Sequence, residues 1–338
     1  MSFTHASLVS NFLVQSGVYE CLNRPGIRDV AINRPGEIWL ENDAGWDREE
    51  RPNLDYTMCE KLANALAAFN NQSLTTKSPI KTVELPTSER GLIVMPPACE
   101  ASTISMTFRK PSLQRLTLQG YIDSGRFENA HAISHRGMEL DEWQIMLKSH
   151  HKNKDWARFF ELAILNKQNI IIFGGTGSGK TTFAKALVDL FPTNRRMLTI
   201  EAINELKLPY HPNHVHLIYG DIITPKELVS CSLRMKPDHI FLAELTGDEA
   251  WDFMELLNTG HPGTITTAHA NDTLSGYGRV CGMIKQSNVG VGLDYEYIER
   301  RVRTSFDIVI YMERTHILEV HYEPERKLRL LNSVGVKS

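Results

Sequence analysis

The chain has 338 residues and a mass of 38.3 kDa, a length that corresponds to about two domains. Hydrophobic residues make up 42% of the sequence and charged residues 23%, which excludes collagen-like, coiled-coil and disordered chains. The net charge is −3, and neither the first 110 residues nor the remainder is basic, so bulk positive charge does not hold this protein on nucleic acid.

The cysteine count and the hydropathy indicate a cytoplasmic protein. The five cysteines are an odd number, lie far apart and form no C-x-x-C pair, which favours a reducing compartment and argues against zinc. No apolar run approaches the roughly 18 residues of a membrane span, and the first residues have no basic stretch typical of a secretory signal. We therefore expect any membrane association to come through a partner.

Residues 1–110 are predicted to form a smaller, mixed α+β domain. Apolar and polar residues alternate over 30–32 and 38–40, and Arg34-Pro35-Gly36-Glu37 between them fits a type II turn of a hairpin. Thr57 and Glu60 have the spacing of a capping box, and the apolar spacing that follows predicts a helix to about Phe69. Two further strands are expected near 92–95 and 104–108.

Residues 111–137 are predicted to be a linker that carries a short helix near 116–122, because they are polar and show little periodicity. Residues 138–338 are predicted to be the second domain, which opens with helices near 140–147 and 156–165. Apolar runs at 170–173, 197–200, 239–243 and 265–267 then alternate with helical spacing, and this alternation predicts a parallel sheet with right-handed crossovers. A final β-hairpin is expected over 306–322.

The segment after the first of these strands fits the phosphate-binding pattern G-x-x-x-x-G-K-[ST], with a strand before it and a helix after it. Its glycines let backbone N–H groups approach phosphate oxygens, and the helix N-terminus adds partial positive charge. Lys180 is predicted to reach the β- and γ-phosphates of ATP and Thr181 to bind Mg²⁺. In the helix, Phe183, Ala186, Leu187 and Leu190 share one apolar face. The predicted nucleotide-binding residues are Gly174, Gly175, Thr176, Gly177, Ser178, Gly179, Lys180, Thr181 and Thr182.

Two carboxylates and a histidine are candidates for the catalytic groups. Glu201 and Glu244 each follow a predicted parallel strand, and residues past the carboxyl ends of such strands line the ligand crevice. Either glutamate could orient the attacking water. Since no aspartate precedes Glu244 in its strand, Glu244 would also have to serve the metal. The strand over 265–267 lies between turns that carry His261 and His269, and one of these imidazoles could lie near the γ-phosphate.

Histidines also gather at 211, 214 and 216, but no cysteine or carboxylate near them completes a metal site, so we interpret them as structural. The tyrosines and tryptophan at 251, 295 and 297 lack the basic residues that accompany base stacking, so we expect them to pack in the core or at an interface.

These motifs, taken together, resemble the secretion-motor ATPases of bacterial type II and type IV systems. N-terminal segments narrow the resemblance to the VirB11 branch, the traffic ATPases of type IV secretion, over about residues 20–322. The motifs that carry the resemblance are the phosphate loop, Thr199-Ile200-Glu201, 233–238 leading to Ala243-Glu244-Leu245, Gly260-His261-Pro262-Gly263, His269-Ala270-Asn271, and in addition 33–37, 96–100, 108–111 and 211–216.

The resemblance implies a RecA-like ATPase domain behind an N-terminal domain, with nucleotide between them, in a hexameric ring at the cytoplasmic face of the inner membrane. It implies as partners other secretion-system ATPases and components of the inner-membrane complex. It implies that His261 and His269 form the His box and that Arg90 and Arg109 reach the phosphates. Two positions depart from the family pattern: Ala202 follows Glu201 where Asp is usual, and Thr246 stands where Arg is usual.

The predicted function is therefore an ATP-hydrolysing motor for substrate transfer or pilus assembly. Two alternatives stay open at this point. A RecA-like translocase on nucleic acid would share the same core, and an ATP-binding assembly switch with negligible turnover would be compatible with Ala202. A small-molecule kinase is more distant, because the sequence contains no acceptor-site motif.

Overall fold

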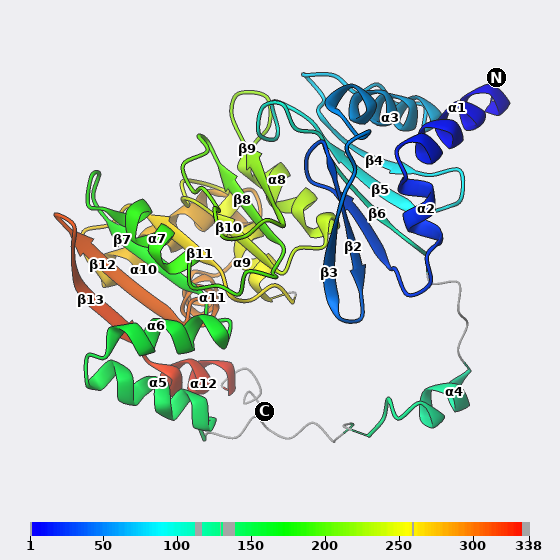
Figure 1. Ribbon diagram of the computed structural model, residues 1–338. Coiled ribbons are helices and arrows are strands. Elements are labelled where there is room, and N and C mark those ends of the chain that lie inside the picture. Colours follow the sequence, from blue (N-terminus) through cyan, green and yellow to red (C-terminus); the bar gives the residue numbers. More distant parts are fainter. Residues whose placement is uncertain (1, 112–116, 129, 131–138, 259, 333–338) are drawn as a thin grey trace.

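A computed structural model describes residues 2–111, 117–128, 130, 139–258 and 260–332 (Figure 1). The N-terminal part is built on a six-stranded antiparallel sheet in the order β3-β2-β1-β6-β5-β4. Its strands are β1 (Asp29–Ile32), β2 (Glu37–Asn42), β3 (Gly45–Glu50), β4 (Ile80–Glu84), β5 (Arg90–Val94) and β6 (Ser105–Arg109). The predicted hairpin is present as β1 and β2, and Gly36 in its turn has φ +88°, as a type II turn requires.

Three helices cover one face of this sheet: α1 (Ser2–Gln15), α2 (Val18–Asn23) and α3 (Tyr56–Phe69) (Figure 1). The predicted capping box at Thr57 and Glu60 is wrong. Helix α3 begins two residues earlier than that box requires, and its cap is Asp55, whose Oδ1 accepts a hydrogen bond from the N–H of Met58 at 2.7 Å. The apolar residues expected on the inner face of the helix do pack in the core, with Leu62 and Leu66 fully buried.

The C-terminal part contains two sheets that continue one another. Strands β10 (His239–Leu242), β8 (Met197–Glu201) and β9 (His214–Ile218) form a parallel sheet in that order. Strands β11 (Ile265–Ala268), β7 (Ile170–Gly174) and β12 (Ile308–Glu313) run parallel to one another, and β13 (His316–Tyr322) is antiparallel to β12. A bridge between Glu244 and Thr267 joins the two sheets. The predicted parallel α/β architecture is thereby confirmed.

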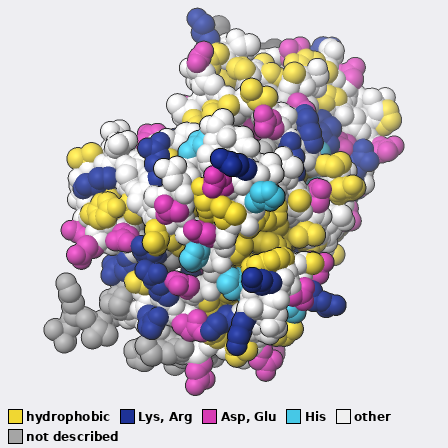
Figure 2. Space-filling view, turned by 90° about the vertical axis from the view of Figure 1, so that its left-hand side faces the viewer, with side chains coloured by type: hydrophobic (Ala, Val, Ile, Leu, Met, Phe, Trp, Pro, Cys, Tyr) yellow, Lys and Arg dark blue, Asp and Glu magenta, His cyan; other side chains and the backbone are white. Residues whose placement is uncertain are grey.

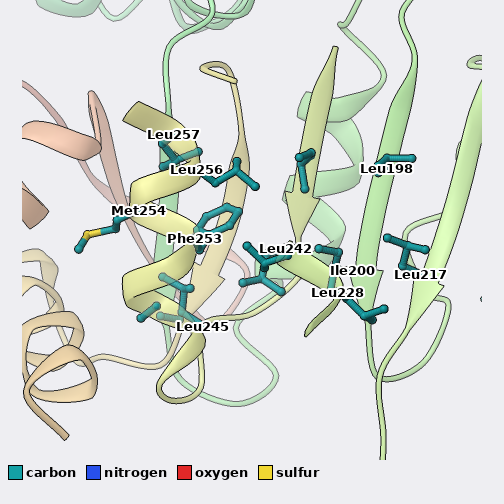
Figure 3. Close-up of a cluster of buried hydrophobic side chains, with 14 of the residues drawn as sticks. Leu198, Ile200, Leu217, Leu228, Leu242, Leu245, Phe253, Met254, Leu256 and Leu257 are labelled. Carbon is teal, nitrogen blue, oxygen red and sulfur yellow. The ribbon is translucent and has the colours of Figure 1, made fainter. Parts of the chain in front are cut away.

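Helices pack on both faces of this sheet because the strand side chains alternate between two apolar clusters. One face is covered by α8 (Pro225–Ser232), α9 (Glu249–Asn258), α10 (Thr273–Gln286) and α11 (Tyr295–Ser305). Figure 3 shows part of this cluster, where Phe253 of α9 and Leu242 of β10 meet. The other face is covered by α6 (Trp156–Leu165) and α7 (Lys180–Val188), with α5 (Glu142–Lys152) packed on α6. Short 3-10 turns at Leu233–Met235 and Gly290–Gly292 and helix α12 (Pro324–Asn332) complete the described elements.

A fully buried arginine joins the N-terminal sheet to the C-terminal sheet. Arg196, which immediately precedes β8, donates hydrogen bonds to Oδ1 of Asn33 and of Asn213, each at 2.7 Å, and to the carbonyl of Met235 at 2.8 Å. Its guanidinium also stacks over Trp46 at 4.9 Å. Along β9, the backbone of Ala98–Glu100 adds hydrogen bonds of the strand type to His216 and Ile218. The outer strand β9 is therefore covered by the N-terminal part of the same chain.

The segment between the two parts contains α4 (Leu118–Asp123), which overlaps the short helix predicted near 116–122. Much of the predicted linker, at 112–116, 129 and 131–137, lies outside the described residues. The limits 1–110, 111–137 and 138–338 thus stay a prediction. None of the described helices is both long enough and apolar enough to cross a bilayer.

The histidines near β9 make hydrogen bonds within the fold, and in the described residues no group of three or more His, Cys, Asp and Glu side chains is placed to hold a metal. His216 shares a hydrogen bond with Thr199 Oγ1 at 2.8 Å, and the His211 ring bonds to the carbonyl of Phe191 at 2.9 Å. Burial lowers the pKa of His214 to about 3 and the pKa values of His216 and His239 to about 4.

These three depressed pKa values predict acid destabilisation. A histidine that is held neutral in the fold takes up a proton in the unfolded chain below pH 6.5, so stability is complete above that pH and falls as the pH drops toward 4. By pH 5 each histidine should lower the free energy of unfolding by about 2 kcal/mol. Urea unfolding at pH 7 and pH 5 measures this loss of unfolding free energy, and His239→Gln should reduce the loss by about 2 kcal/mol. The matched variant His316→Gln, at an exposed position of β13, should leave the pH dependence unchanged.

Candidate nucleotide-binding site

The phosphate loop runs from the end of β7 to the start of α7, and glycine is required at three of its positions. Gly177 and Gly179 have φ +71° and +87°, in the left-handed region that favours glycine. A Cβ at Gly174 would lie 2.4 Å from the carbonyl oxygen of Met312. At Gly175 a Cβ would meet no atom within 4 Å, so the loop is open on that side. The loop is thus a cradle that brings backbone N–H groups to one face, which fits phosphate.

Lys180 is the first residue of α7 and is 8% exposed. Its Nζ donates hydrogen bonds to the carbonyls of Gly174 and Gly175, each at 2.9 Å. Burial lowers the pKa of Lys180, and the negative charge of Glu244 acts in the opposite direction. Ser178 Oγ is buried and has no hydrogen-bond partner among the described residues. Thr181 is half-buried and Thr182 exposed, both in the first turn of α7.

Glu244 and His269 come together at the ends of two neighbouring strands. Glu244 follows β10 and His269 follows β11, and the bridge between Glu244 and Thr267 fixes their register. His269 Nε2 lies 2.9 Å from Glu244 Oε1. Both side chains are partly exposed, at 32% for Glu244 and 48% for His269, so water can reach the pair. Lys180, Glu244 and His269 therefore form one cluster at the carboxyl edge of the sheet.

Glu201 lies at the same edge but in a different environment. Its carboxylate is buried, and Oε1 accepts hydrogen bonds from the N–H groups of Leu206 at 2.8 Å and Glu205 at 3.3 Å. Burial raises the pKa of Glu201. Its Oε2 is buried and unpartnered in the part of the chain that the structure describes. Glu201 thus holds the loop after β8 with one oxygen and keeps the other available, whereas Glu244 is accessible to solvent.

A buried carboxylate that the sequence analysis missed holds the turn after Glu244. Glu249 is 3% exposed, and its Oε1 accepts hydrogen bonds from Thr246 N–H at 2.6 Å, Thr246 Oγ1 at 3.1 Å and Gly247 N–H at 2.9 Å. Thr246, where the family usually has Arg, therefore closes this turn with Glu249. The signal was present as the spacing Thr246-x-x-Glu249, a Thr and Glu three residues apart before an apolar helix.

We expect Glu249→Ala to lower the kcat of ATP hydrolysis about tenfold, because the turn after Glu244 loses three hydrogen bonds to a buried carboxylate. The loss of these bonds should also destabilise the fold by about 1–3 kcal/mol. Glu249→Gln keeps the Oε1 acceptor and should restore most of kcat. Steady-state kinetics with thermal unfolding of both variants tests this, and equal kcat in the alanine variant and the wild type would contradict a positioning role.

A cavity of about 590 Å³ opens beside the phosphate loop. It is lined by Gly175, Thr176 and His269 and by residues of α10 that include Arg279 and Gln286. Asn271 also lines it, from the loop before α10. The sequence analysis named neither Arg279 nor Gln286, because a polar residue on the outer face of a helix carries no signal of a site by itself.

Three predicted site residues lie elsewhere in the chain. His261 precedes β11, so this strand, roughly 13 Å long, separates it from His269. Burial lowers the pKa of His261, and the nearby charges of Lys236 and Lys167 lower it further. These lysines shortly precede β10 and β7, so His261 lies at the amino edge of the sheet. Arg109 Nε lies 3.6 Å from Asp29, whose carboxyl also interacts with Lys236. Arg90 is the cross-strand neighbour of Arg109. Within one chain the structure does not bring His261, Arg90 or Arg109 to the phosphate loop.

The residues fit Mg²⁺ with ATP better than a metal held by protein alone. Magnesium is typically bound through one or two side-chain oxygens together with phosphate oxygens and water. Thr181 offers a hydroxyl and Glu244 a carboxylate next to the cradle, and no larger cluster of acidic or histidine ligands occurs in the described ranges.

Comparison with known proteins gives consistent matches. The family model described as "Type II/IV secretion system protein" matches residues 131–317. Type IV secretion system protein VirB11 of Brucella suis is 39% identical over 91% of this chain and 89% of its own length. PtlH of Bordetella pertussis, another type IV secretion system protein, is 35% identical over 87% of each chain. The crystal structure of the Brucella suis VirB11 ATPase with sulphate has a TM-score of 0.92, 38% identity and 98% coverage of both chains.

The likeness therefore extends over most of the chain, since the solved structure covers 98% of it and the two relatives cover 91% and 87%. The resemblance that the motifs predicted is confirmed, as is the α/β fold class. The chain belongs to the type II/IV secretion system protein family.

Proposed function

We propose that this protein is an ATPase that hydrolyses Mg²⁺-ATP to drive a type IV secretion system, in substrate transfer, pilus assembly or both. The observation that carries the proposal is the cluster of Lys180, Glu244 and His269 beside a glycine cradle. A nucleotide switch needs the cradle and the lysine, but it does not need an accessible carboxylate 2.9 Å from a histidine next to them.

The residues have separate roles in this proposal. The backbone of 174–179 and Lys180 bind the phosphates and neutralise charge on the transferred phosphoryl group. Thr181, and Glu244 directly or through a water, would hold Mg²⁺, which when bound would supply further charge neutralisation at the phosphates. Glu244 orients the attacking water, because its carboxylate is accessible, whereas Glu201 is buried and holds a loop. His269, at 2.9 Å from Glu244, fixes that carboxylate and responds to the loss of the γ-phosphate.

Arg90, Arg109 and His261 act on nucleotide from a neighbouring copy in this proposal. Arg90 and Arg109 are cross-strand neighbours in the N-terminal sheet and His261 precedes β11, while the cradle follows β7 at the carboxyl edge, so one chain supplies all three at a distance from its own nucleotide. An arginine that reaches the phosphates across a subunit contact couples hydrolysis to the contact itself. This supports the hexameric ring that the family resemblance implies.

The proposal extends to location and partners. None of the described helices is long and apolar enough to span a membrane. The protein would therefore reach the cytoplasmic face of the inner membrane through other secretion-system ATPases and components of the inner-membrane complex.

Two measurements on the purified wild-type chain test this function. Phosphate release with Mg²⁺-ATP should be measurable and should change less than twofold with single-stranded DNA, and particle mass should rise to that of six copies with nucleotide. A tenfold stimulation by DNA would favour a nucleic-acid translocase. Phosphate release no faster than that of Lys180→Ala would favour an assembly switch. A monomer under all conditions would contradict the ring.

A further inference from the structure

An apolar groove lies on the face of the protein that carries α6, α7 and the outer strand β13. It has a volume of about 790 Å³, and Figure 2 shows hydrophobic side chains gathered on this face with histidines and basic side chains around them. We call it the edge groove. Its apolar lining includes Trp156 and Phe160 of α6, Phe183 and Ala186 of α7, Leu190 just after α7, and Ile317 and Leu318 of β13.

The edge groove contains the apolar helix face that the sequence predicted for α7. Of the four residues predicted to share this face, only Leu187 is buried, because α7 turns Ala184 and Val188 toward the sheet. Leu190 is 40% exposed and Leu318 on β13 is 56% exposed. Contiguous exposed apolar surface of this kind marks an interaction site more often than scattered single residues do.

A second exposed apolar surface lies on α4 and the turn after it, in residues 117–128. Leu118 is 71% exposed, Tyr121 44%, Ile122 49% and Phe127 51%, and no residue of α4 is buried. Figure 1 shows α4 apart from both sheets and away from α7 and β13. A six-residue helix with so little burial is not stable alone, so its conformation depends on a contact that one chain does not supply.

The charges of the two surfaces are complementary. Lys152 and Lys154 line the edge groove near Trp156, against a single acidic residue, Glu161. The segment 117–128 carries Asp123 and Glu128 beside its apolar side chains, against a single Arg126. Opposite charges on the two surfaces favour one orientation of the segment in the groove and add to the rate at which it binds.

Two different surfaces that fit each other on one chain specify a head-to-tail contact between copies. Such a heterologous contact generates a closed ring when the rotation between neighbours closes, whereas a self-complementary surface stops at a dimer. A second copy of this chain is therefore the binding partner that we infer for both surfaces, because every copy carries one edge groove and one segment 117–128.

We propose that Leu118, Tyr121, Ile122 and Phe127 of one chain pack into the edge groove of the neighbouring chain in the ring. The inference rests on the proposed ring-forming function. Its consequence is direct, because the wall of the groove is α7, whose first residue is Lys180. A neighbour's linker then lies against the helix that binds the phosphates, so each copy contacts the nucleotide helix of the next one.

Cross-linking in the full-length chain tests the contact. Ile122→Cys and Leu190→Cys are made as separate variants, one with a size tag, and treated with a short bis-maleimide in Mg²⁺-ATP. The five native cysteines are buried, so the introduced thiols are the accessible ones. We expect a cross-linked pair of one tagged and one untagged chain in the mixture and in neither variant alone.

A substitution that leaves the fold of each chain intact gives the second readout. Ile122→Asp should require at least tenfold more protein to reach half-maximal ring assembly in sedimentation experiments. The matched control is Val291→Asp, a residue that is 67% exposed outside the edge groove, which should assemble like the wild type.

The outcomes separate the contact from the ring itself. If the wild type forms six-fold particles but the mixture gives no cross-linked pair, the contact is wrong and the proposed function stands. If one chain that carries both cysteines cross-links within itself, the segment docks on its own groove and the contact between copies is wrong. Flotation with anionic lipid vesicles that Ile122→Asp abolishes, with assembly unchanged, would assign the segment to a membrane surface. A wild type that neither assembles nor hydrolyses ATP would overturn the proposed function as well.

Discussion

Glu244→Gln is expected to lower the rate of ATP hydrolysis about 10³-fold while ATP binding stays close to that of the wild type. The amide keeps the size of the side chain but can neither carry the charge that orients the attacking water nor accept its proton. Binding depends on the glycine cradle and Lys180, which Glu244→Gln leaves in place. Phosphate release, together with titration of a fluorescent ATP analogue, measures both quantities in one preparation.

Two further variants make the Glu244 result specific. Glu255→Gln removes another partly exposed glutamate, on α9, that pairs with Arg301, and it should hydrolyse ATP at the wild-type rate. Lys180→Ala should lose binding as well as hydrolysis, since it removes the cation next to the phosphates. A larger loss in Glu201→Gln than in Glu244→Gln would transfer the water-orienting role to Glu201 and its unpartnered Oε2.

Arg196→Met is expected to lower the free energy of unfolding by about 3–5 kcal/mol. Burial lowers the pKa of Arg196 only to about 10, so it is charged at neutral pH. Its removal leaves the Asn33 amide oxygen and the carbonyl of Met235 without this donor, and leaves Asn213 Oδ1 with only the hydrogen bond from the Asn33 amide. Urea unfolding followed by circular dichroism measures the effect as a shift in midpoint.

Arg195→Met is the matched control, one residue away. Arg195 is 40% exposed and makes a single long ion pair of 3.9 Å with Asp238, so its replacement should change stability by no more than about 0.5 kcal/mol. Equal midpoints for the two variants would show that the buried hydrogen-bond network does not stabilise the contact between the sheets.

The sequence predicted the parallel sheet well, because β7, β8, β10 and β11 are buried on both faces and therefore continuous apolar runs. It did not predict β3, since Gly45–Glu50 is an outer strand with mostly charged, partly exposed side chains and no apolar alternation. The cap of α3 was misassigned because Asp55 and Thr57 both suit an N-cap, and only the chain direction before the helix decides between them.

The same limits apply to the candidate site. Lys180 follows from a contiguous motif, and Glu244 and His269 follow from their place after parallel strands. Their 2.9 Å contact depends on β10 lying beside β11, which local sequence does not encode. The family resemblance implied that His261 and His269 form one His box, but the strand between them extends the chain and puts the two histidines at opposite edges of the sheet.

The contact between the two sheets limits how the N-terminal and C-terminal parts of one chain can move relative to each other. At one end of β9, Arg196 makes buried hydrogen bonds to both parts of the chain. Along β9, the backbone of Ala98–Glu100 pairs with the strand. The N-terminal sheet is thus held to the C-terminal sheet over the length of β9. We therefore expect the described parts of the two sheets to move together as one rigid unit. In the proposed ring, movement driven by phosphate release would then be a change of angle between whole subunits.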